Sequence, residues 1–440
     1  MHTVNLGMIG GGTVGSGVYR ALEQNADLMA SRLGLRIHLR KVAVKAYDEP
    51  RPYPIPRAVM TLDWREVVND PRVQLVVELV GGTTIAKTMV LTALALGKPV
   101  ITANKALLAA HGPELFAAAR KHGANLYYEA SVAGGIPIIK VVRESLVGNR
   151  FERIYGIVNG TCNYILTRMK REGADFAAVL ADAQAHGYAE AEPSLDVDGH
   201  DAAHKTVILA SLAHGFWVDQ DAIHVEGIRG ITRLDIQFAG QLGYTIKLLG
   251  VIKRFVTGGR GGGQPRIQVA VYPALVPDGH VLASINDVFN AIFVRGDIVG
   301  DTLYYGRGAG KDATASAVLG DLADAAVDLK NGGECRVPPF EPHSHDGALL
   351  PVGQSVSRYY VRLSVLDQPG VIAKISAILG RARISIASII QPEGHEGEVI
   401  PLILMLHAAP YAAMRRALAA IGRLPAVKAP PALLRVEDLA

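Results

Sequence analysis

The chain has 440 residues, of which 49% are hydrophobic and 20% charged, and its formal net charge is +4. This balance is typical of a globular protein with two or three domains and excludes the disordered and fibrous classes. The 45 basic and 41 acidic residues are interspersed without a Lys/Arg block, so no nucleic-acid partner is expected.

The number and spacing of the cysteines and the length of the apolar runs indicate the cellular compartment. Cys162 and Cys335 are far apart and form no metal-binding spacing, so a disulfide framework is not expected and a reducing compartment fits best. The first residues lack the charged start and long apolar run of a signal peptide. No uninterrupted apolar run reaches the roughly 18 residues that a membrane helix requires. We therefore expect a cytoplasmic protein with no membrane partner.

Short apolar strands alternate with helices over the first 128 residues. Strands are predicted at 4–9, 37–44, 75–79, 100–102 and 125–128, and helices after residue 13, at 84–96 and at 113–121. Such alternation predicts a parallel sheet with right-handed crossovers.

The pattern changes from about residue 129. A glycine-rich stretch at 258–263 predicts an exposed flexible loop, and 312–329 an Ala-rich helix. The segment 331–357 is rich in Pro, Gly and His and is typical of a linker. Residues 359–436 then follow the order strand, helix, strand, strand, helix, strand, which is ferredoxin-like.

The first strand runs directly into Gly10, Gly12 and Gly15, which satisfy the G-x-G-x-x-G pattern, and Thr13 and Val14 lie between the last two glycines. The first glycine permits a tight turn, the second lets backbone approach a pyrophosphate, and the third allows close packing of helix on strand. A glycine-rich turn can be merely a turn. Its place between a strand and a helix favours dinucleotide binding.

The end of the second predicted strand bears on cofactor choice. NAD enzymes usually place an acid there, whereas NADP enzymes offer a cation to the 2′-phosphate. This chain has Lys45, which favours NADP(H), although an ordinary surface lysine is the alternative and NAD(H) use stays open. Thr83 and Lys105 follow later strands at the same edge of the sheet, where Lys105 could meet cofactor or substrate or be an exposed loop residue.

Residues 187–205 hold the densest chemistry. Acids recur through a stretch that Pro193 and Gly199 are expected to keep from being helical, and a helix is predicted from about Asp201. Asp201 and Lys205 are four residues apart and share one helix face. On the surface such a pair contributes only about 0.3–0.5 kcal/mol. In a closed site beside a cofactor, a lysine can exchange a proton with a substrate hydroxyl.

Several stretches together closely resemble homoserine dehydrogenases in order and spacing, over essentially the whole chain. These are 10–15, 102–105, 128–137, 159–166 and 187–205. The resemblance implies a Rossmann-type α/β nucleotide domain over 1–128, completed by about 306–330. It further implies an α+β catalytic and dimerisation domain over 129–305, the linker 331–357, and a ferredoxin-like domain over 358–440.

The resemblance also implies roles for five residues in the interconversion of L-homoserine and L-aspartate-4-semialdehyde. Lys205 matches the acid/base lysine and Asp201 the acid that supports it. Lys105 matches a second lysine of the site. Glu190 and Asp196 match acids that bind the substrate's amino group.

A monovalent cation and a second glycine loop are implied in the same way. Glu129, Val132, Gly134 and Ile136 match positions that hold the cation, usually sodium, largely through backbone carbonyls. Gly308 matches a glycine loop on the cofactor side of the site.

The C-terminal region, with its run 366–371, resembles an ACT domain, an amino-acid-sensing module. This implies feedback inhibition by L-threonine, the alternative being a dimerisation module that has lost ligand binding. Family resemblance also implies a homodimer or homotetramer. Two other readings stay open: a dehydrogenase acting on another amino-acid-derived carbonyl, and a non-catalytic amino-acid sensor.

Overall fold

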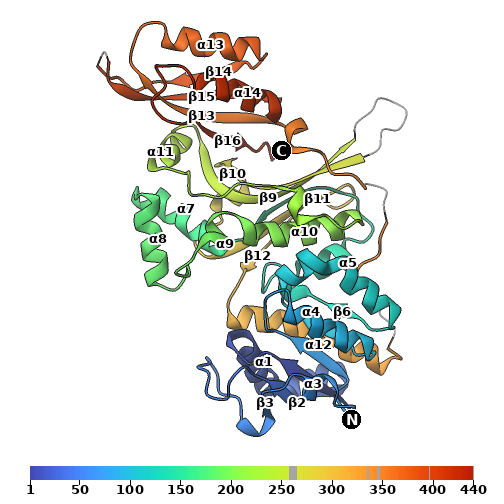
Figure 1. Ribbon diagram of the computed structural model, residues 1–440. Coiled ribbons are helices and arrows are strands. Elements are labelled where there is room, and N and C mark those ends of the chain that lie inside the picture. Colours follow the sequence, from blue (N-terminus) through green and yellow to red (C-terminus); the bar gives the residue numbers. More distant parts are fainter. Residues whose placement is uncertain (257–264, 334–335, 344–346, 396, 440) are drawn as a thin grey trace.

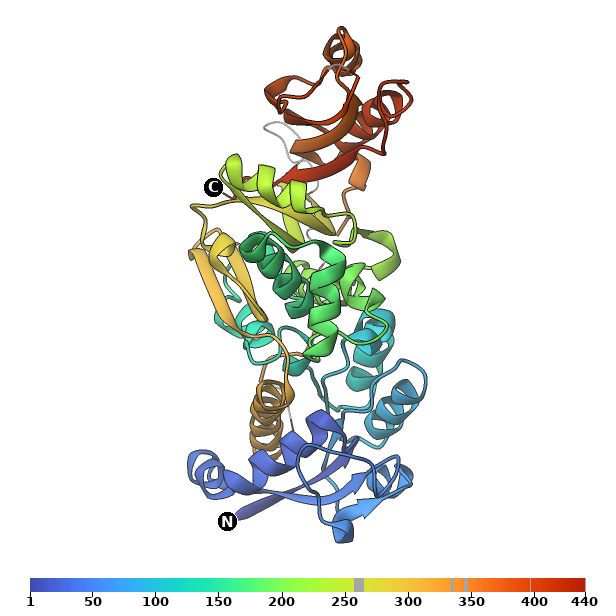
Figure 2. The ribbon, with the colours of Figure 1, turned by 90° about the vertical axis from the view of Figure 1, so that its left-hand side faces the viewer.

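The computed structural model describes residues 1–256, 265–333, 336–343, 347–395 and 397–439. The glycine-rich loop predicted at 258–263 and Cys335 lie outside the described residues. The molecule is elongated, with the N-terminal sheet at one end, a large mixed sheet in the middle and the C-terminal region at the other end (Figures 1 and 2). In the part of the chain that the structure describes, no helix has the length and apolarity needed to span a membrane.

Six parallel strands form the N-terminal sheet in the order β3-β2-β1-β4-β5-β6. They are β1 (His2–Ile9), β2 (Leu35–Ala43), β3 (Met60–Thr61), β4 (Leu75–Glu78), β5 (Val100–Thr102) and β6 (Leu126–Tyr127). The accompanying helices are α1 (Thr13–Gln24), α2 (Ala26–Leu33), α3 (Arg65–Val68), α4 (Ile85–Ala95) and α5 (Lys105–Lys121). The strand order reverses between β1 and β4, and ligands of such sheets bind outside the carboxyl ends of the strands at that point.

A helix from much later in the chain completes this region. The helix α12 (Lys311–Lys330) packs against α1, as Figure 1 shows. A Cβ at Gly17 of α1 would lie only 2.9 Å from the carbonyl oxygen of Lys311, so the two helices approach backbone to backbone. The buried face of α12 includes Ala315, Val318 and Leu322. The long return of the chain thereby covers one face of the sheet.

The predicted start of α5 was wrong by eight residues. The expected helix began at Pro113, but α5 begins at Lys105 and Pro113 lies inside it. Asn104 caps the helix, since its side chain accepts the N–H of Leu107 at 3.1 Å. Lys105 is consequently the first residue of a helix and not a loop residue.

The mixed sheet has ten strands within the described residues. Their order is β12-β11-β7-β9-β10-β16-β13-β15-β14, with β8 paired to β10. They are β7 (Phe151–Ile157), β8 (His224–Val225), β9 (Tyr244–Val256), β10 (Pro265–Pro277), β11 (Phe289–Gly296), β12 (Gly300–Arg307), β13 (Val356–Leu366), β14 (Ile386–Ile390), β15 (Val399–Pro410) and β16 (Ala432–Val436). The helices that accompany it are α6 (Ile138–Lys140), α7 (Gly160–Glu172), α8 (Phe176–Ala185), α9 (Ser194–Val197), α10 (His200–His214), α11 (Arg233–Gln241), α13 (Val371–Arg381) and α14 (Tyr411–Ile421).

The C-terminal region has the predicted order β13, α13, β14, β15, α14, β16, and the predicted fold class is confirmed. Its sheet is continuous with that of the middle region, because β16 pairs with β10 on one side and with β13 on the other. The described residues before it also pack on the body of the protein. Phe340 is buried between Phe116 and Trp217, and Tyr128 donates to the carbonyl of Pro339 at 2.6 Å.

Candidate active site

A cavity of about 580 Å³ lies where the N-terminal sheet meets the middle region. Elements far apart in the sequence line it: the helix that follows the glycine turn, the start of α5, the segment after β6, the N-terminus of α7, α10 and the chain leading into α12. Among its lining residues are Val14, Lys105, Ser131, Gly134, Asn159, Gly160, Thr161, Tyr188, Asp196, Asp201, Lys205 and Gly308. Seven of the residues predicted for the site therefore line one cavity.

The glycine turn has the geometry that a nucleotide phosphate requires. Gly10 has φ +107°, which disfavours any side chain, and a Cβ at Gly15 would lie 2.0 Å from the carbonyl oxygen of Gly10. A Cβ at Gly12 would meet nothing within 4 Å, so space is open beside the turn. The helix α1 begins at Thr13 without a side-chain cap, and its free N–H groups and dipole favour an anion there.

Lys45 and Thr83 lie at the same edge of the sheet but do not line this cavity. Lys45 is exposed two residues beyond the end of β2, and Thr83 is half-buried in the loop between β4 and α4. The guanidinium of Arg51 donates to the carbonyls of Tyr47 and Ala46, each at 3.1 Å, and so folds the loop that follows Lys45.

Two lysines converge on one buried carboxylate. Lys205 Nζ donates to Asp201 Oδ2 at 2.7 Å and to the carbonyl of Val158 at 2.7 Å. Lys105 Nζ lies 3.2 Å from Asp201 Oδ1. Burial by itself would raise the pKa of Asp201, but the two ammonium groups outweigh it and hold that pKa below its ordinary value. Asp201 is therefore ionised at neutral pH and holds both lysines at the cavity wall.

Asn159 joins the two acids of the site, and we did not single out its side chain from the sequence. Its Nδ2 donates to Asp196 Oδ1 at 2.7 Å and to Asp201 Oδ2 at 2.8 Å, while its Oδ1 accepts the N–H of Cys162 and caps α7. Burial raises the pKa of Asp196, although the hydrogen bond from Asn159 opposes the change. An Asn before Gly160 at a helix start signals the cap, but no local signal reveals the contact with Asp201.

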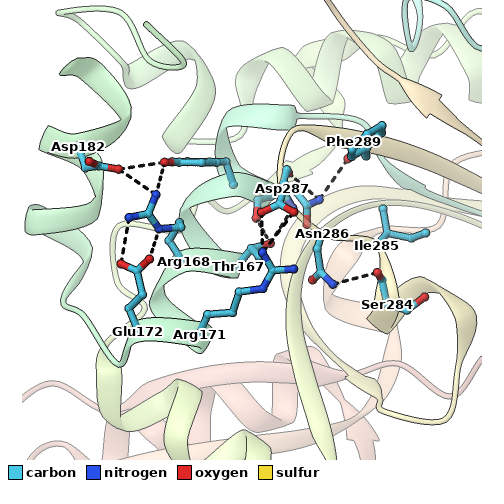
Figure 3. Close-up of polar contacts among 12 residues, drawn as sticks. Thr167, Arg168, Arg171, Glu172, Asp182, Ser284, Ile285, Asn286, Asp287 and Phe289 are labelled. Carbon is cyan, nitrogen blue, oxygen red and sulfur yellow. Dashed lines mark hydrogen bonds and ion pairs between the residues drawn. The ribbon is translucent and has the colours of Figure 1, made fainter. Parts of the chain in front are cut away.

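Polar contacts further along α7 fix its orientation. Arg171 Nη1 pairs with Asp287 Oδ1 at 2.9 Å, and Thr167 Oγ1 accepts the N–H of Asp287 at 3.1 Å. Figure 3 shows these contacts, with Arg168 between Glu172 and Asp182. Because α7 is held along its length, the Asn159 at its start is held against the cavity.

The stretch that carries Glu190 and Asp196 departs from the prediction in two respects. We expected no helix between Pro193 and Gly199, yet α9 forms one turn there, since Pro193 stands just before the first helical residue. The side chain of Glu190 is exposed and does not line the cavity, although Tyr188, two residues earlier, does. Asp196 lines it and Glu190 does not.

The predicted cation segment is a buried backbone curl. Ala133 and Gly134 have φ of 55° and 51°, and a Cβ at Gly134 would lie 2.5 Å from the carbonyl of Gly308. The Glu129 carboxylate accepts the N–H groups of Ile139 and Lys140 at 2.9 and 2.8 Å. Since that carboxylate is already engaged, a cation here would be held by backbone carbonyl oxygens, which suit a hard cation.

Two buried apolar positions of the curl, and a second acid beside Glu129, complete this region. Val132 and Ile136 are buried, at 0% and 3% exposure. Burial raises the pKa of Glu129 to about 7, and Asp321 accepts its backbone N–H at 2.9 Å. Burial likewise raises the pKa of Asp321.

The fold and this cavity define an oxidoreductase that acts on a CH–OH group, with a dinucleotide-binding sheet beside a lysine–carboxylate cluster. A family model described as the NAD binding domain of homoserine dehydrogenase matches residues 10–129, and one described as homoserine dehydrogenase matches residues 137–323. An ACT domain model matches residues 359–423. The chain belongs to the homoserine dehydrogenase family.

Individual relatives agree over the full length. A homoserine dehydrogenase of Pseudomonas aeruginosa is 44% identical over 444 residues, covering 100% of both chains. One of Neisseria gonorrhoeae is 41% identical over 442 residues, also covering 100% of both. The crystal structure of a homoserine dehydrogenase from Thiobacillus denitrificans is 40% identical, covers 100% of this chain and 99% of that one, and superposes with a TM-score of 0.91.

Proposed function

We propose that this chain catalyses the NADP(H)-dependent interconversion of L-homoserine and L-aspartate-4-semialdehyde, an early reaction of threonine and methionine synthesis. The observation that carries the proposal is the pairing of Lys205 and Lys105 on Asp201 in a cavity bordered by the helix that follows the glycine turn. A bound nicotinamide cofactor supplies the hydride chemistry.

Lys205 acts as the general acid and base. Its Nζ gives a proton to the aldehyde oxygen in reduction and takes one from the alcohol in oxidation. Asp201 and the Val158 carbonyl each accept from Nζ at 2.7 Å and so aim the ammonium. Lys105 binds cofactor or substrate on the other side of the same carboxylate. Holding these groups before the reactants arrive is the protein's main contribution.

The substrate's ammonium group binds Asp196, which lines the cavity, with Glu190 as the second acid. Glu190 is exposed in this structure, so its part requires residues 187–192 to close over the substrate. The Val158 carbonyl at the same wall already accepts a hydrogen bond from Lys205 Nζ, so we do not assign it to the substrate's ammonium group. Asp196 is therefore the acid that the geometry favours as the primary contact.

The cofactor would bind along Gly10, Gly12, Thr13 and Val14, with Thr83 and Gly308 beside it. The exposed ammonium of Lys45 at the end of β2 favours the 2′-phosphate of NADP(H) over NAD(H), because a charge-assisted contact there is available only to NADP(H). A sodium ion would be held by the carbonyls of the curl at 129–136, where it stabilises the wall of the cavity and takes no part in the reaction.

The C-terminal region would sense L-threonine. A cavity of about 430 Å³ there is lined by residues 365–372 and Gln391, whose amide donates to Asp367 Oδ1 at 3.1 Å. That cavity lies in the loop between β13 and α13 and offers both polar and apolar groups to a small amino acid. Assembly into a homodimer or homotetramer forms part of the same proposal.

The test is nicotinamide absorbance during oxidation of L-homoserine by the purified protein in sodium-containing buffer, with NADP and NAD compared. Wild type and Lys41→Ala, which alters a surface lysine paired with Glu66, should turn over equally. Lys205→Ala should lose roughly 10²–10⁴-fold in kcat. Absence of turnover in the folded wild-type protein with either cofactor would refute the proposal and leave an amino-acid sensor as the better account.

A further inference from the structure

Residues 224–235, which we term the connector segment, run from β8 into the first turn of α11. The segment contacts two different parts of the molecule. The ends of the segment touch strands and a helix of the C-terminal region. The middle touches residues 192–199, which we term the site loop and which includes Asp196. The segment begins with β8, which pairs with β10, and ends in α11, which lies below the C-terminal strands in Figure 1.

The first end is anchored by Glu226. Its Oε2 lies 3.0 Å from Arg435 Nη1 of β16, and its Oε1 accepts from Tyr411 of α14 at 3.1 Å. Burial would raise the pKa of Glu226, but the hydrogen bond from His224 and the charge of Arg435 lower it to about 2. The guanidinium of Arg435 also lies between the rings of Tyr272 and Tyr411, at 4.2 and 4.4 Å.

The second end is anchored by Asp235, which is 1% exposed. Arg362 of β13 donates to both of its carboxylate oxygens, at 2.8 and 3.1 Å, and Tyr360 donates to it at 3.1 Å. Asp235 also forms the capping box of α11 with Thr232. A displacement of β13 would therefore act directly on the start of α11.

The middle of the connector segment holds the site loop. The N–H of Ile228 donates to the Val197 carbonyl at 2.8 Å, and Arg229 Nε pairs with Asp198 Oδ1 at 2.5 Å. A Cβ at Gly227 would lie 2.2 Å from the Val197 carbonyl, so the two backbones are in close contact. Val197 and Asp198 directly follow Asp196, which Asn159 holds from the other side.

We propose that Arg229 and the Gly227–Ile228 backbone are positioning groups for Asp196, and that the C-terminal region sets their position through Glu226 and Asp235. The inference rests on the proposed role of Asp196 in binding the substrate's ammonium group. A misplacement of about 1 Å can cost roughly 100-fold in a site of this kind. The affinity for substrate should change most, because the Lys205 ammonium is held by Val158 and Asp201 and not by the connector segment.

The experiment compares Arg229→Gln and Arg362→Leu with Glu437→Gln. Arg229 has an exposed side chain, so its replacement leaves the core intact. Glu437 contacts Tyr272 and Lys253 near the same junction of β10 and β16 but touches neither the connector segment nor the site loop. It therefore serves as the matched control for a weakened junction. Steady-state kinetics with homoserine and amide hydrogen exchange over residues 193–200 are measured for each protein.

Arg229→Gln and Arg362→Leu should each raise KM for homoserine at least about fivefold, the lower end of coupling between sites, with kcat within about threefold. Both should also speed amide exchange in the site loop, and Glu437→Gln should change neither. An unchanged KM and unchanged exchange in Arg229→Gln, or equal changes in the control, would overturn the inference. Failure of the proposed function is distinguishable, because wild type would then show no homoserine turnover while site-loop exchange remained measurable.

Discussion

Asp201→Asn is the most informative single substitution in this protein. The side chain is 8% exposed and carries the negative charge that two lysines share. Asn has nearly the same shape, so the cavity keeps its form while that charge disappears. The amide oxygen can still accept one hydrogen bond, but the lysine ammonium groups then repel each other without a counter-ion. We expect the fold to persist and the chemistry to suffer.

The distances from the two lysine ammonium groups to the Asp201 carboxylate set the size of the expected loss in kcat/KM. At an effective dielectric constant of about 20, charges 2.7 Å apart attract by about 6 kcal/mol and charges 3.2 Å apart by about 5 kcal/mol. Desolvation of the buried groups offsets much of this attraction, and removing one partner of a buried pair typically costs about 3–5 kcal/mol. The amide keeps part of the hydrogen bonding, so we expect about 3 kcal/mol, or roughly 100-fold in kcat/KM when the loss falls on the transition state.

The assay is homoserine oxidation followed at the nicotinamide band, with urea unfolding of both proteins at pH 7 and pH 3. The folded-state pKa of Asp201 lies below its ordinary value, so its contribution to stability is complete above about pH 4 and is lost as the pH falls through the folded-state pKa. Wild type should therefore lose more stability between pH 7 and pH 3 than the variant. A kcat/KM within threefold of wild type would refute the reasoning that this carboxylate organises the two lysines.

Four further substitutions test the nucleotide and cation regions. Lys45→Ser should raise KM for NADP about tenfold, the loss of one charged hydrogen bond, and leave NAD unchanged; equal effects in initial-rate assays would make Lys45 a surface lysine. Gly15→Ala should lower both the melting temperature and cofactor affinity, because its Cβ would lie 2.0 Å from the Gly10 carbonyl, whereas Gly12→Ala should keep the melting temperature. A normal melting temperature for Gly15→Ala would contradict this packing. The pKa of Glu129 is raised to about 7, so the folded state binds the proton more tightly and stability should fall by up to about 3 kcal/mol from pH 4.5 to 7. Glu129→Gln should flatten that fall in denaturant titrations, and an unchanged slope would show that Glu129 does not cause it.

The local parts of the site were predictable from the sequence. The glycine spacing after an apolar strand indicated the turn at Gly10, because the backbone there has a positive φ that side chains disfavour. The i,i+4 spacing placed Asp201 and Lys205 on one helix face, and they are in contact. Both depend only on the geometry of a few neighbouring residues. The same local reasoning erred at Pro113, where packing of α5 kept a proline inside a helix.

What the sequence by itself determined was therefore the alternation of strands and helices in the N-terminal region, the element order of the C-terminal region, the glycine turn and the pairing within α10, since backbone periodicity and steric limits act over short distances. Only the tertiary structure decided that Lys105 meets Asp201, that Asn159 bridges Asp196 and Asp201, and that β16 joins the C-terminal sheet to β10. These contacts unite segments that no periodicity relates. They depend on how α5, α7 and α10 pack around one cavity, which the burial of many side chains decides together.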